Sequence, residues 1–297
     1  HSNDSSGNID NLPTSIDIAG IGVKLGKGFS IFAGKQCTAY GGIEFDLNPI
    51  EIYEYSDMIE NMSNFMTGLN IGYDINAHQQ LNLQILDSRN DSFNKTYGVE
   101  TEDGEQPTIE SGKLPLVYTL NWNGNFNDIF KTRWSASIMN EAKDKNLYYF
   151  AFGNELNLNK FNMFLDFMYS KEGIDRKGIM TGITGSMERH NAFDAGYFSM
   201  VTKLNYRFLP KWNAFVKGMY ETASLTKQQG DLEKGKYRTA WGYFAGVEFY
   251  PMDTNLHFFL TYVGRSYDFT ARAKALGQEN YSTNRVSVGF IYQLPMF

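Results

Sequence analysis

Apolar and polar residues alternate along most of this chain, in segments of roughly ten residues that are separated by connectors. The clearest segment places apolar side chains at every second position: Phe161, Met163, Leu165, Phe167 and Tyr169. Successive side chains of a β-strand point to opposite faces, so one face of such a strand suits lipid and the other suits water. The pattern predicts thirteen strands, over residues 15–25, 28–38, 63–75, 80–87, 115–123, 128–139, 147–156, 160–170, 195–208, 212–223, 239–250, 255–267 and 284–296.

The connectors between these strands alternate between short and long. The short ones carry the Gly, Asn, Asp and Pro residues of tight turns, and the long ones span 39–62, 88–114, 171–194, 224–238 and 268–283. One connector on the long side, 140–146, is short. Many strands with short turns at one rim and long loops at the other predict an all-β fold, a transmembrane antiparallel β-barrel of the outer-membrane type. The short turns are then expected to face the periplasm and the long loops the outside.

The parity of the strands adds a further expectation. If the last strand ends on the periplasmic side, the first predicted strand begins at the outer rim, whereas bacterial barrels have an even number of strands. We therefore expect N-terminal strands to be missing from the sequence, with residues 1–13 as the remnant of an outer loop and residues 14–297 as one barrel domain. The alternative is that the count is wrong by one strand.

Composition changes this picture little. The mean hydropathy is −0.40, and no apolar run approaches the roughly 18 residues of a membrane helix, but a barrel exposes only alternate residues to lipid. A soluble β-sandwich or lipocalin-like barrel is the alternative, and the number of strands and the long loops on one side argue against it. The net charge is −6 without a basic stripe, so nucleic acid is not an expected partner. The single cysteine, Cys37, excludes an intrachain disulfide.

A resemblance to a known family lies near the end of the second predicted strand. The residues that carry it are Gly34-Lys35-Gln36, Tyr40-Gly41-Gly42-Ile43-Glu44-Phe45-Asp46, Asn48-Pro49-Ile50 and Tyr53. This segment resembles the phosphate-selective porin O and P family of Gram-negative outer membranes, in the form found in Bacteroides-like bacteria. The resemblance implies a barrel of about 16 strands, usually a homotrimer, that passes anions or small solutes. It also implies that residues 39–62 are the outer loop that folds inward and narrows the pore.

This loop is acidic. Residues 40–62 contain no Lys or Arg, and their six carboxylates are Glu44, Asp46, Glu51, Glu54, Asp57 and Glu60. Asn48, Pro49 and Glu51 are typical of a helix start, after which Ile52, Tyr55, Ile59 and Met62 would share one helical face. We predict a short helix that packs on the inner wall and holds the carboxylates toward the lumen, at a pore constriction. The alternative is an ordinary surface loop with solvated acids.

The strand phase assigns basic residues to the water-facing wall. They are Lys131, Arg133, Lys203, Arg207, Lys217, Arg265 and Arg285. A charge on the lipid face costs about 2–4 kcal/mol near the bilayer midplane, so this phase is well determined. The acidic residues of the same wall are Glu155, Asp166, Glu221 and Glu248. Acids on the loop would face bases across the pore and produce an electric field transverse to the pore axis. Such a pore would prefer one sign of ion only weakly. The alternative is that these charges pair with one another.

The aromatic residues predict membrane-interface girdles at Trp122, Trp212, Trp241, Tyr206, Tyr250 and Tyr292. The terminal Phe297 resembles the last residue by which such barrels are recognised for assembly.

The four histidines are scattered, so we expect no catalytic residues, no metal site, no cofactor and no enzyme activity. The acidic stretch 99–110 is expected to be a solvated loop, with a divalent cation site as its alternative.

These observations predict an outer-membrane porin for passive diffusion of small hydrophilic solutes or ions with weak charge selectivity. A phosphate- or anion-selective channel is the alternative within transport. A plugged barrel that acts as a scaffold or partner in an envelope complex is the alternative of another class. The expected partners are outer-membrane lipid, lipopolysaccharide, small solutes or ions, and other copies of the chain in a trimer.

Overall fold

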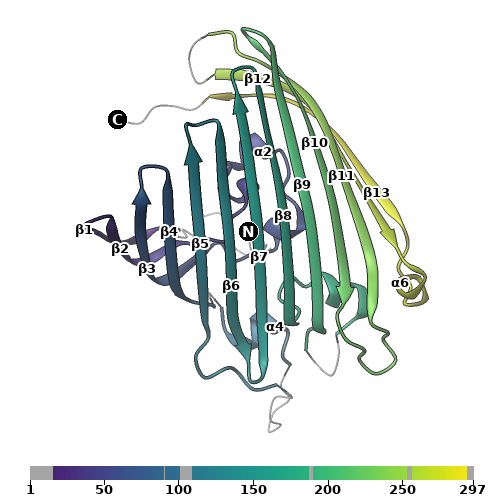
Figure 1. The fold of residues 1–297 in the computed structure, drawn as a ribbon. Helices are drawn as coiled ribbons and strands as arrows, with labels where there is room; N and C mark the ends of the chain where they lie inside the picture. The colour runs from purple at the N-terminus through teal and green to yellow at the C-terminus, as the bar shows by residue number, and fades with distance from the viewer. Residues whose placement is uncertain (1–15, 90, 101–108, 187–189, 253–255, 293–297) are drawn as a thin grey trace, which may run out of the picture.

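Among the residues that the structure describes, thirteen antiparallel strands form one sheet, and each strand pairs with its neighbours in the sequence (Figure 1). The computed structural model describes residues 16–89, 91–100, 109–186, 190–252 and 256–292. The strands are β1 Ala19–Gly26, β2 Phe29–Cys37, β3 Phe65–Asn76, β4 Gln79–Asp87, β5 Leu116–Phe126, β6 Phe130–Ala142, β7 Lys145–Leu158, β8 Phe161–Ile174, β9 Phe193–Leu209, β10 Trp212–Leu225, β11 Gly235–Phe249, β12 Leu256–Phe269 and β13 Tyr281–Tyr292. The predicted number and order of the strands are confirmed. The predictions for residues 1–13 and for Phe297 lie outside the described residues.

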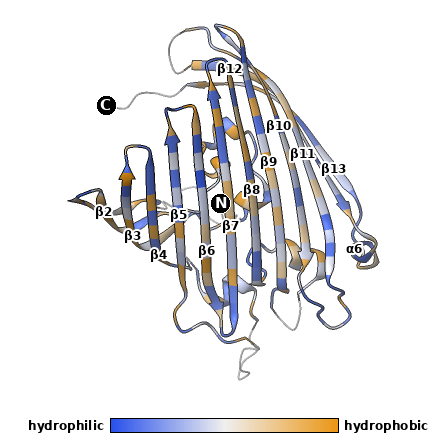
Figure 2. Cartoon of the chain, viewed as in Figure 1, coloured by the Kyte–Doolittle hydropathy of each residue, from blue (hydrophilic) through white to orange (hydrophobic). Residues whose placement is uncertain are grey.

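In the strands in the middle of the sheet, the two phases meet different surroundings, and the hydropathy colours in Figure 2 alternate along these strands. In β10, Trp212 and Val216 are exposed on one face, whereas Asn213, Phe215 and Lys217 are buried on the other. The same alternation runs through β6 to β9. The predicted strand phase is therefore confirmed, with an apolar outer face and a polar inner face.

The sheet is a curved wall that does not close on itself. Among the described residues, β1 pairs only with β2 and β13 pairs only with β12. The described strands thus form an open, curved antiparallel wall with two unpaired edges.

Short turns and long loops lie at opposite rims, as the connector lengths predict. In Figure 1 the tight turns lie at the upper rim, and α4 Phe93–Tyr97 and α6 Ala271–Ala275 lie at the lower one. Asn127 and Asp128 both adopt φ of 57° in the β5–β6 turn, a conformation that suits the twist of a two-residue hairpin. Helix α5, Ile179–Thr184, belongs to another long loop. Within the described ranges, no helix is long and apolar enough to span a bilayer.

The connector between β2 and β3 folds back over the inner face of the wall. It contains three short helices, α1 Ile43–Asp46, α2 Pro49–Ile52 and α3 Asp57–Glu60, and Figure 1 shows α2 behind the strands of the wall. The predicted start is confirmed, because the Asn48 side chain accepts a hydrogen bond from the Ile50 N–H (3.1 Å). The prediction of one continuous helix to Met62 is wrong, because Tyr53 adopts φ of 66° and ends α2.

The main apolar core lies between this connector and the wall. Ile43, Met58 and Ile59 of the connector pack with Met168 and Phe244 of the strands. The connector is thus fixed to the wall by packing as well as by polar contacts.

Candidate pore constriction

We call residues 38–64 the inward loop. Its two ends are tied together, because the Thr38 N–H donates to the Asn64 carbonyl (2.9 Å). Its backbone is also tied to the wall: both carboxylate oxygens of Asp166 accept backbone N–H bonds, from Ile43 (2.9 Å) and Glu44 (2.7 Å). The wall approaches closely here, since a Cβ on Gly153 would lie 2.7 Å from the Gly42 Cα. The loop therefore packs against the inner face of the wall, and its role in narrowing the pore stays a prediction.

Glu44 forms the most deeply buried ion pair of the loop. Its Oε1 lies 2.7 Å from the Lys217 Nζ of β10, and both side chains are completely buried. Its Oε2 accepts a bond from the Ser56 hydroxyl (2.5 Å), and Lys217 also donates to the Glu54 carbonyl (2.6 Å). Glu44 therefore does not present its carboxylate to water, which differs from the expectation for all six loop acids. Charge pairing with Lys217 is the physical reason, since a buried carboxylate needs a partner.

Arg265 of β12 is the centre of a second charge cluster. Its guanidinium lies 2.9 Å from Asp57, 3.3 Å from Glu54 and 2.7 Å from the wall residue Glu221. Arg238 of β11 forms another ion pair with Asp57. Two acids of the loop thus meet the bases of two neighbouring strands.

The other predicted wall bases contact the loop in different ways. Arg133 pairs with Asp46 at 2.8 Å, and Arg285 lies 3.5 Å from Glu54. Lys203 donates to the carbonyl of Glu51 (2.5 Å) rather than to its carboxylate. The remaining residues of the predicted site make no ion pair between loop and wall: Glu51 and Glu60 are exposed, Lys131 lies 3.5 Å from the wall residue Glu155, and Arg207 stacks on the Tyr250 ring.

These contacts change the predicted transverse field. Four loop acids, Glu44, Asp46, Glu54 and Asp57, touch bases of the wall directly instead of facing them across an open pore. The alternative in which the charges pair with one another describes them better. The physical reason is that the loop packs onto the wall that carries the bases, which leaves no water layer between them.

Aromatic residues also pack the loop against the same wall. Tyr53 stacks on Phe215 with ring centres 4.9 Å apart and donates its hydroxyl hydrogen to Glu248 (2.8 Å). Burial, with Glu248 nearby, raises the pKa of Tyr53 above its ordinary value. Tyr149 and Phe164 are also buried, so these inward aromatics are packed rather than open to a solute.

Sequence reasoning missed two features of this region. Arg238 falls on the water-facing phase, but the predicted strand began at residue 239 and so left it in a loop. Tyr250 was assigned to the outer girdle, whereas its hydroxyl donates to Glu248 (3.0 Å) and its ring stacks on His257 on the inner side. For Arg238, beginning the strand one residue earlier gives the correct face. Tyr250 already lay in the predicted strand, and it has the same phase as the inward-facing Glu248.

Comparison with known proteins agrees with this architecture. Residues 1–294 match the family described as phosphate-selective porin O and P. The chain belongs to this family. It is a porin of the Gram-negative outer membrane, a channel for the passive diffusion of solutes. No curated protein sequence matches the porin.

Solved outer-membrane proteins share the fold of the porin. The channel DcaP of Acinetobacter baumannii is 11% identical with a TM-score of 0.60, over 88% of this chain and 70% of that one. OccD3 of Pseudomonas aeruginosa is 12% identical with a TM-score of 0.50, over 95% and 69%. OmpT of Vibrio cholerae is 10% identical with a TM-score of 0.50, over 91% and 77%. At these identities the porin shares their fold, and its selectivity has to be argued from its own residues.

Proposed function

We propose that the inward loop is the constriction of the pore and that the pore discriminates only weakly between cations and anions. The observation that carries this proposal is the direct pairing of Glu44, Asp46, Glu54 and Asp57 with bases of the wall. A pair of opposite charges a few ångströms apart acts on a passing ion as a dipole, whose effect falls off faster than that of a single charge. Salt weakens it further, because the screening length is about 10 Å at 0.1 M.

An anion-selective pore needs cationic side chains that are free to meet the solute. Among the described residues, Arg133, Lys217 and Arg265 each contact a loop carboxylate. Lys203 is engaged by a loop carbonyl. These four bases therefore hold the loop in place, which favours weak selectivity over phosphate binding.

Removal of the loop acids tests the proposal. The triple variant Glu51→Gln, Glu54→Gln and Asp57→Asn keeps side-chain size but removes the loop partners of Arg265 and Arg238, and Arg265 keeps only the wall residue Glu221. We expect the reversal potential in a KCl gradient across a planar bilayer to shift toward anions. An unchanged potential would contradict the role given to the loop.

A matched control uses an acid far from the constriction. Glu110 lies in an outer loop, where it forms an exposed ion pair with Lys143 at 3.0 Å. Glu110→Gln removes one carboxylate as well, but we expect it to leave the reversal potential unchanged. A shift as large as that of the triple variant would mean that the overall charge, and not the loop, sets selectivity.

We also infer that the porin works as a homotrimer among lipid and lipopolysaccharide and has no enzyme activity. Family membership and the apolar outer face of the wall support this assembly. The mass of the detergent-solubilised porin tests the trimer. A protein that inserts into bilayers but shows no current would instead favour the plugged scaffold.

A further inference from the structure

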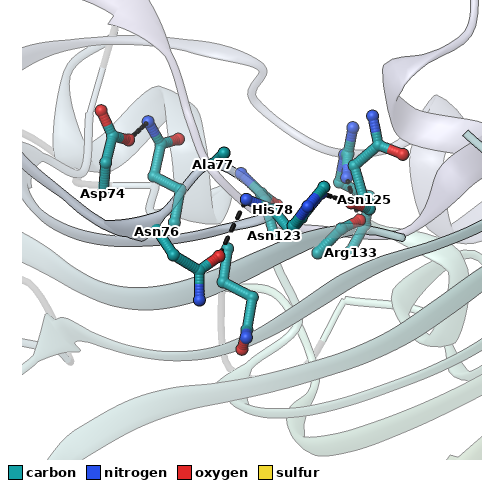
Figure 3. Close-up of a pocket in the computed structure, with 10 residues that line it drawn as sticks. Asp74, Asn76, Ala77, His78, Asn123, Asn125 and Arg133 are labelled. Carbon is teal, nitrogen blue, oxygen red and sulfur yellow. Dashed lines mark hydrogen bonds between the residues drawn. The ribbon is translucent and has the colours of Figure 1, made fainter. Parts of the chain in front are cut away.

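Several bases on the inner face of the wall lie beside acids. Arg133 pairs with Asp46 at 2.8 Å, and the pocket at the turn rim that Arg133 lines also contains Asp74 (Figure 3). Lys217 and Arg265 likewise contact carboxylates. An anionic ligand at these bases would therefore meet acidic side chains as well.

Three lysines lie instead on the outer, lipid-facing phase of their strands. They are Lys35 of β2, Lys171 of β8 and Lys236 of β11. Each is among the four residues of its strand nearest to the loop rim, which we expect to face the outside. A charge on this phase is costly at the bilayer midplane but costs little near the interface. These lysines therefore lie at the level of the lipid headgroups.

Lys236 reaches the outer phase through a β-bulge. Ala223 of β10 is opposite Arg238 of β11. The next residue, Ser224, is opposite Lys236, so Tyr237 is an extra residue on β11. An extra residue of this kind changes the face to which the side chain beyond it points. Accordingly, Tyr237 is buried and Lys236 is exposed, on the side of the wall opposite to Arg238.

Lys171 and Lys236 lie in one row across four neighbouring strands. Lys171 pairs with Gly196 of β9, which pairs with Ser224 of β10, and Ser224 is opposite Lys236. Neighbouring strands lie about 4.8 Å apart, so three steps place the backbones of the two lysines about 14 Å from each other. Gly196 has no side chain, and the short Ser224 side chain donates to the Gly196 carbonyl (3.0 Å). The two long cationic side chains therefore border a low strip of the sheet, and we call these four residues the lysine row.

Aromatic side chains adjoin the lysine row on the outer face. Tyr148 of β7 is opposite Lys171, and Phe150 is opposite Tyr169 at the next outer position away from the loop rim. All three rings are exposed. Aromatic side chains of this kind are favoured at the boundary between headgroups and acyl chains. The outer face here thus combines cations on the headgroup side with aromatic rings on the acyl-chain side.

Acidic side chains do not neutralise the lysine row. Among the described residues, neither Lys171 nor Lys236 forms an ion pair, whereas the nearby Lys227 is held by Asp194 at 2.9 Å. Asp268 of β12 also lies on the outer phase, opposite Thr239 rather than opposite Lys236. Two ammonium groups of the row are therefore available to an anionic partner.

We propose that the lysine row binds the anionic headgroup of lipopolysaccharide in the outer leaflet. Ammonium groups form strong, charge-assisted hydrogen bonds with phosphate oxygens. The low strip at Gly196 and Ser224 leaves room for the sugars of the headgroup, and the aromatic rings lie where its acyl chains begin. This inference goes beyond the pore and rests on the proposed position of the porin among lipopolysaccharide.

Lipid binding by the detergent-solubilised porin tests the proposal. The probes are lipid A with its phosphate groups and the same lipid A after dephosphorylation, and native mass spectrometry gives a dissociation constant for each. We expect the unaltered porin to prefer the phosphorylated lipid. A lysine near an anionic lipid surface contributes about a fivefold gain in binding, so Lys171→Gln with Lys236→Gln should weaken binding roughly tenfold to thirtyfold. Arginine at both positions keeps the charges and should preserve the binding.

Lys35→Gln is the matched control. It removes a lysine from the same phase near the same rim, but on β2, which is far along the sheet from β8. We expect it to change the dissociation constant less than about twofold, because a distant exposed charge is screened. Equal losses for Lys35→Gln and the double variant, or unchanged binding in the double variant, would overturn the proposal.

Two other outcomes would assign the lysine row to a different partner and overturn the proposal. Displacement of lipid A by millimolar inorganic phosphate would indicate a site for free phosphate. A change in the mass of the solubilised porin would indicate a contact between copies of the chain. Failure of the proposed function is a separate result, because it would show as no current or as strong ion selectivity in the unaltered porin. The double variant should leave the reversal potential unchanged.

Discussion

The buried pair of Lys217 and Glu44 makes a specific prediction at the scale of single residues. Lys217→Met removes the base and leaves the Glu44 carboxylate buried without its ionic partner. We expect the free energy of unfolding in lipid, measured by urea titration, to fall by about 3–5 kcal/mol. The double variant with Glu44→Leu should recover much of this loss, because it removes the uncompensated charge.

Lys131 provides the control for this prediction. It lies 3.5 Å from Glu155, and both side chains are partly exposed to water. Lys131→Met is expected to cost less than about 1 kcal/mol, as is usual for solvated pairs. Equal losses in the free energy of unfolding for both lysine variants would show that burial does not increase the contribution of the Glu44–Lys217 pair.

Tyr55 makes a prediction about pH. Burial, and to a lesser extent Glu44, Glu60 and Glu51, raises the pKa of its hydroxyl to about 12 from the ordinary value of 10.0. The neutral form is the one favoured in the folded loop, where it donates to the Leu47 carbonyl (2.8 Å). The stability that this group contributes is thus fully present below pH 10 and is lost as the pH rises toward 12.

Alkaline titration measures this shift directly. The difference in tyrosinate absorbance between the unaltered porin and Tyr55→Phe should develop near pH 12. A difference that develops at pH 10 would mean that Tyr55 is freely solvated.

Single residues also show the limit of sequence reasoning. The alternation places Lys217 and Arg265 on the inner face correctly, because face depends only on strand phase. It cannot show that Glu44 is buried while Glu51 and Glu60 are exposed, because this depends on how the loop folds onto strands that are distant in the sequence.

At the scale of elements, the inward loop depends on a close approach to β7. A Cβ at position 153 would lie 2.7 Å from the Gly42 Cα and from the Ile43 nitrogen. We expect Gly153→Ala to push α1 away from the wall, which should raise single-channel conductance and its noise. Gly218→Ala is the control, since its Cβ would meet only the Thr202 methyl, at 3.7 Å. Equal conductance and equal current noise in the two variants would contradict close packing of the loop on β7.

The same loop shows which parts of an element can be predicted. The N-cap at Asn48 is a local signal, and the structure contains the expected cap. The break at Tyr53 is set by distant partners, because this residue turns away from the helix to reach Phe215 and Glu248. Tertiary contacts therefore divide one predicted helix into two.

For the whole molecule, alternation of residues and of connector lengths predicted thirteen strands, their order and their two rims. Both signals arise from the bilayer, which imposes an apolar outer face on every strand, so they persist along the entire chain. Selectivity has no such repeated signal. It depends on which charges the loop neutralises, and only the packed structure shows those pairs.

The reversal potential of the unaltered porin tests the central claim most directly. A planar bilayer that separates two KCl concentrations at neutral pH reports the ratio of K⁺ to Cl⁻ permeability. Because four of the six loop acids, Glu44, Asp46, Glu54 and Asp57, are paired with bases of the wall, we predict an open channel with a potential close to zero. A potential close to the chloride equilibrium value would contradict this account, because it would show that the wall bases act on ions as free charges.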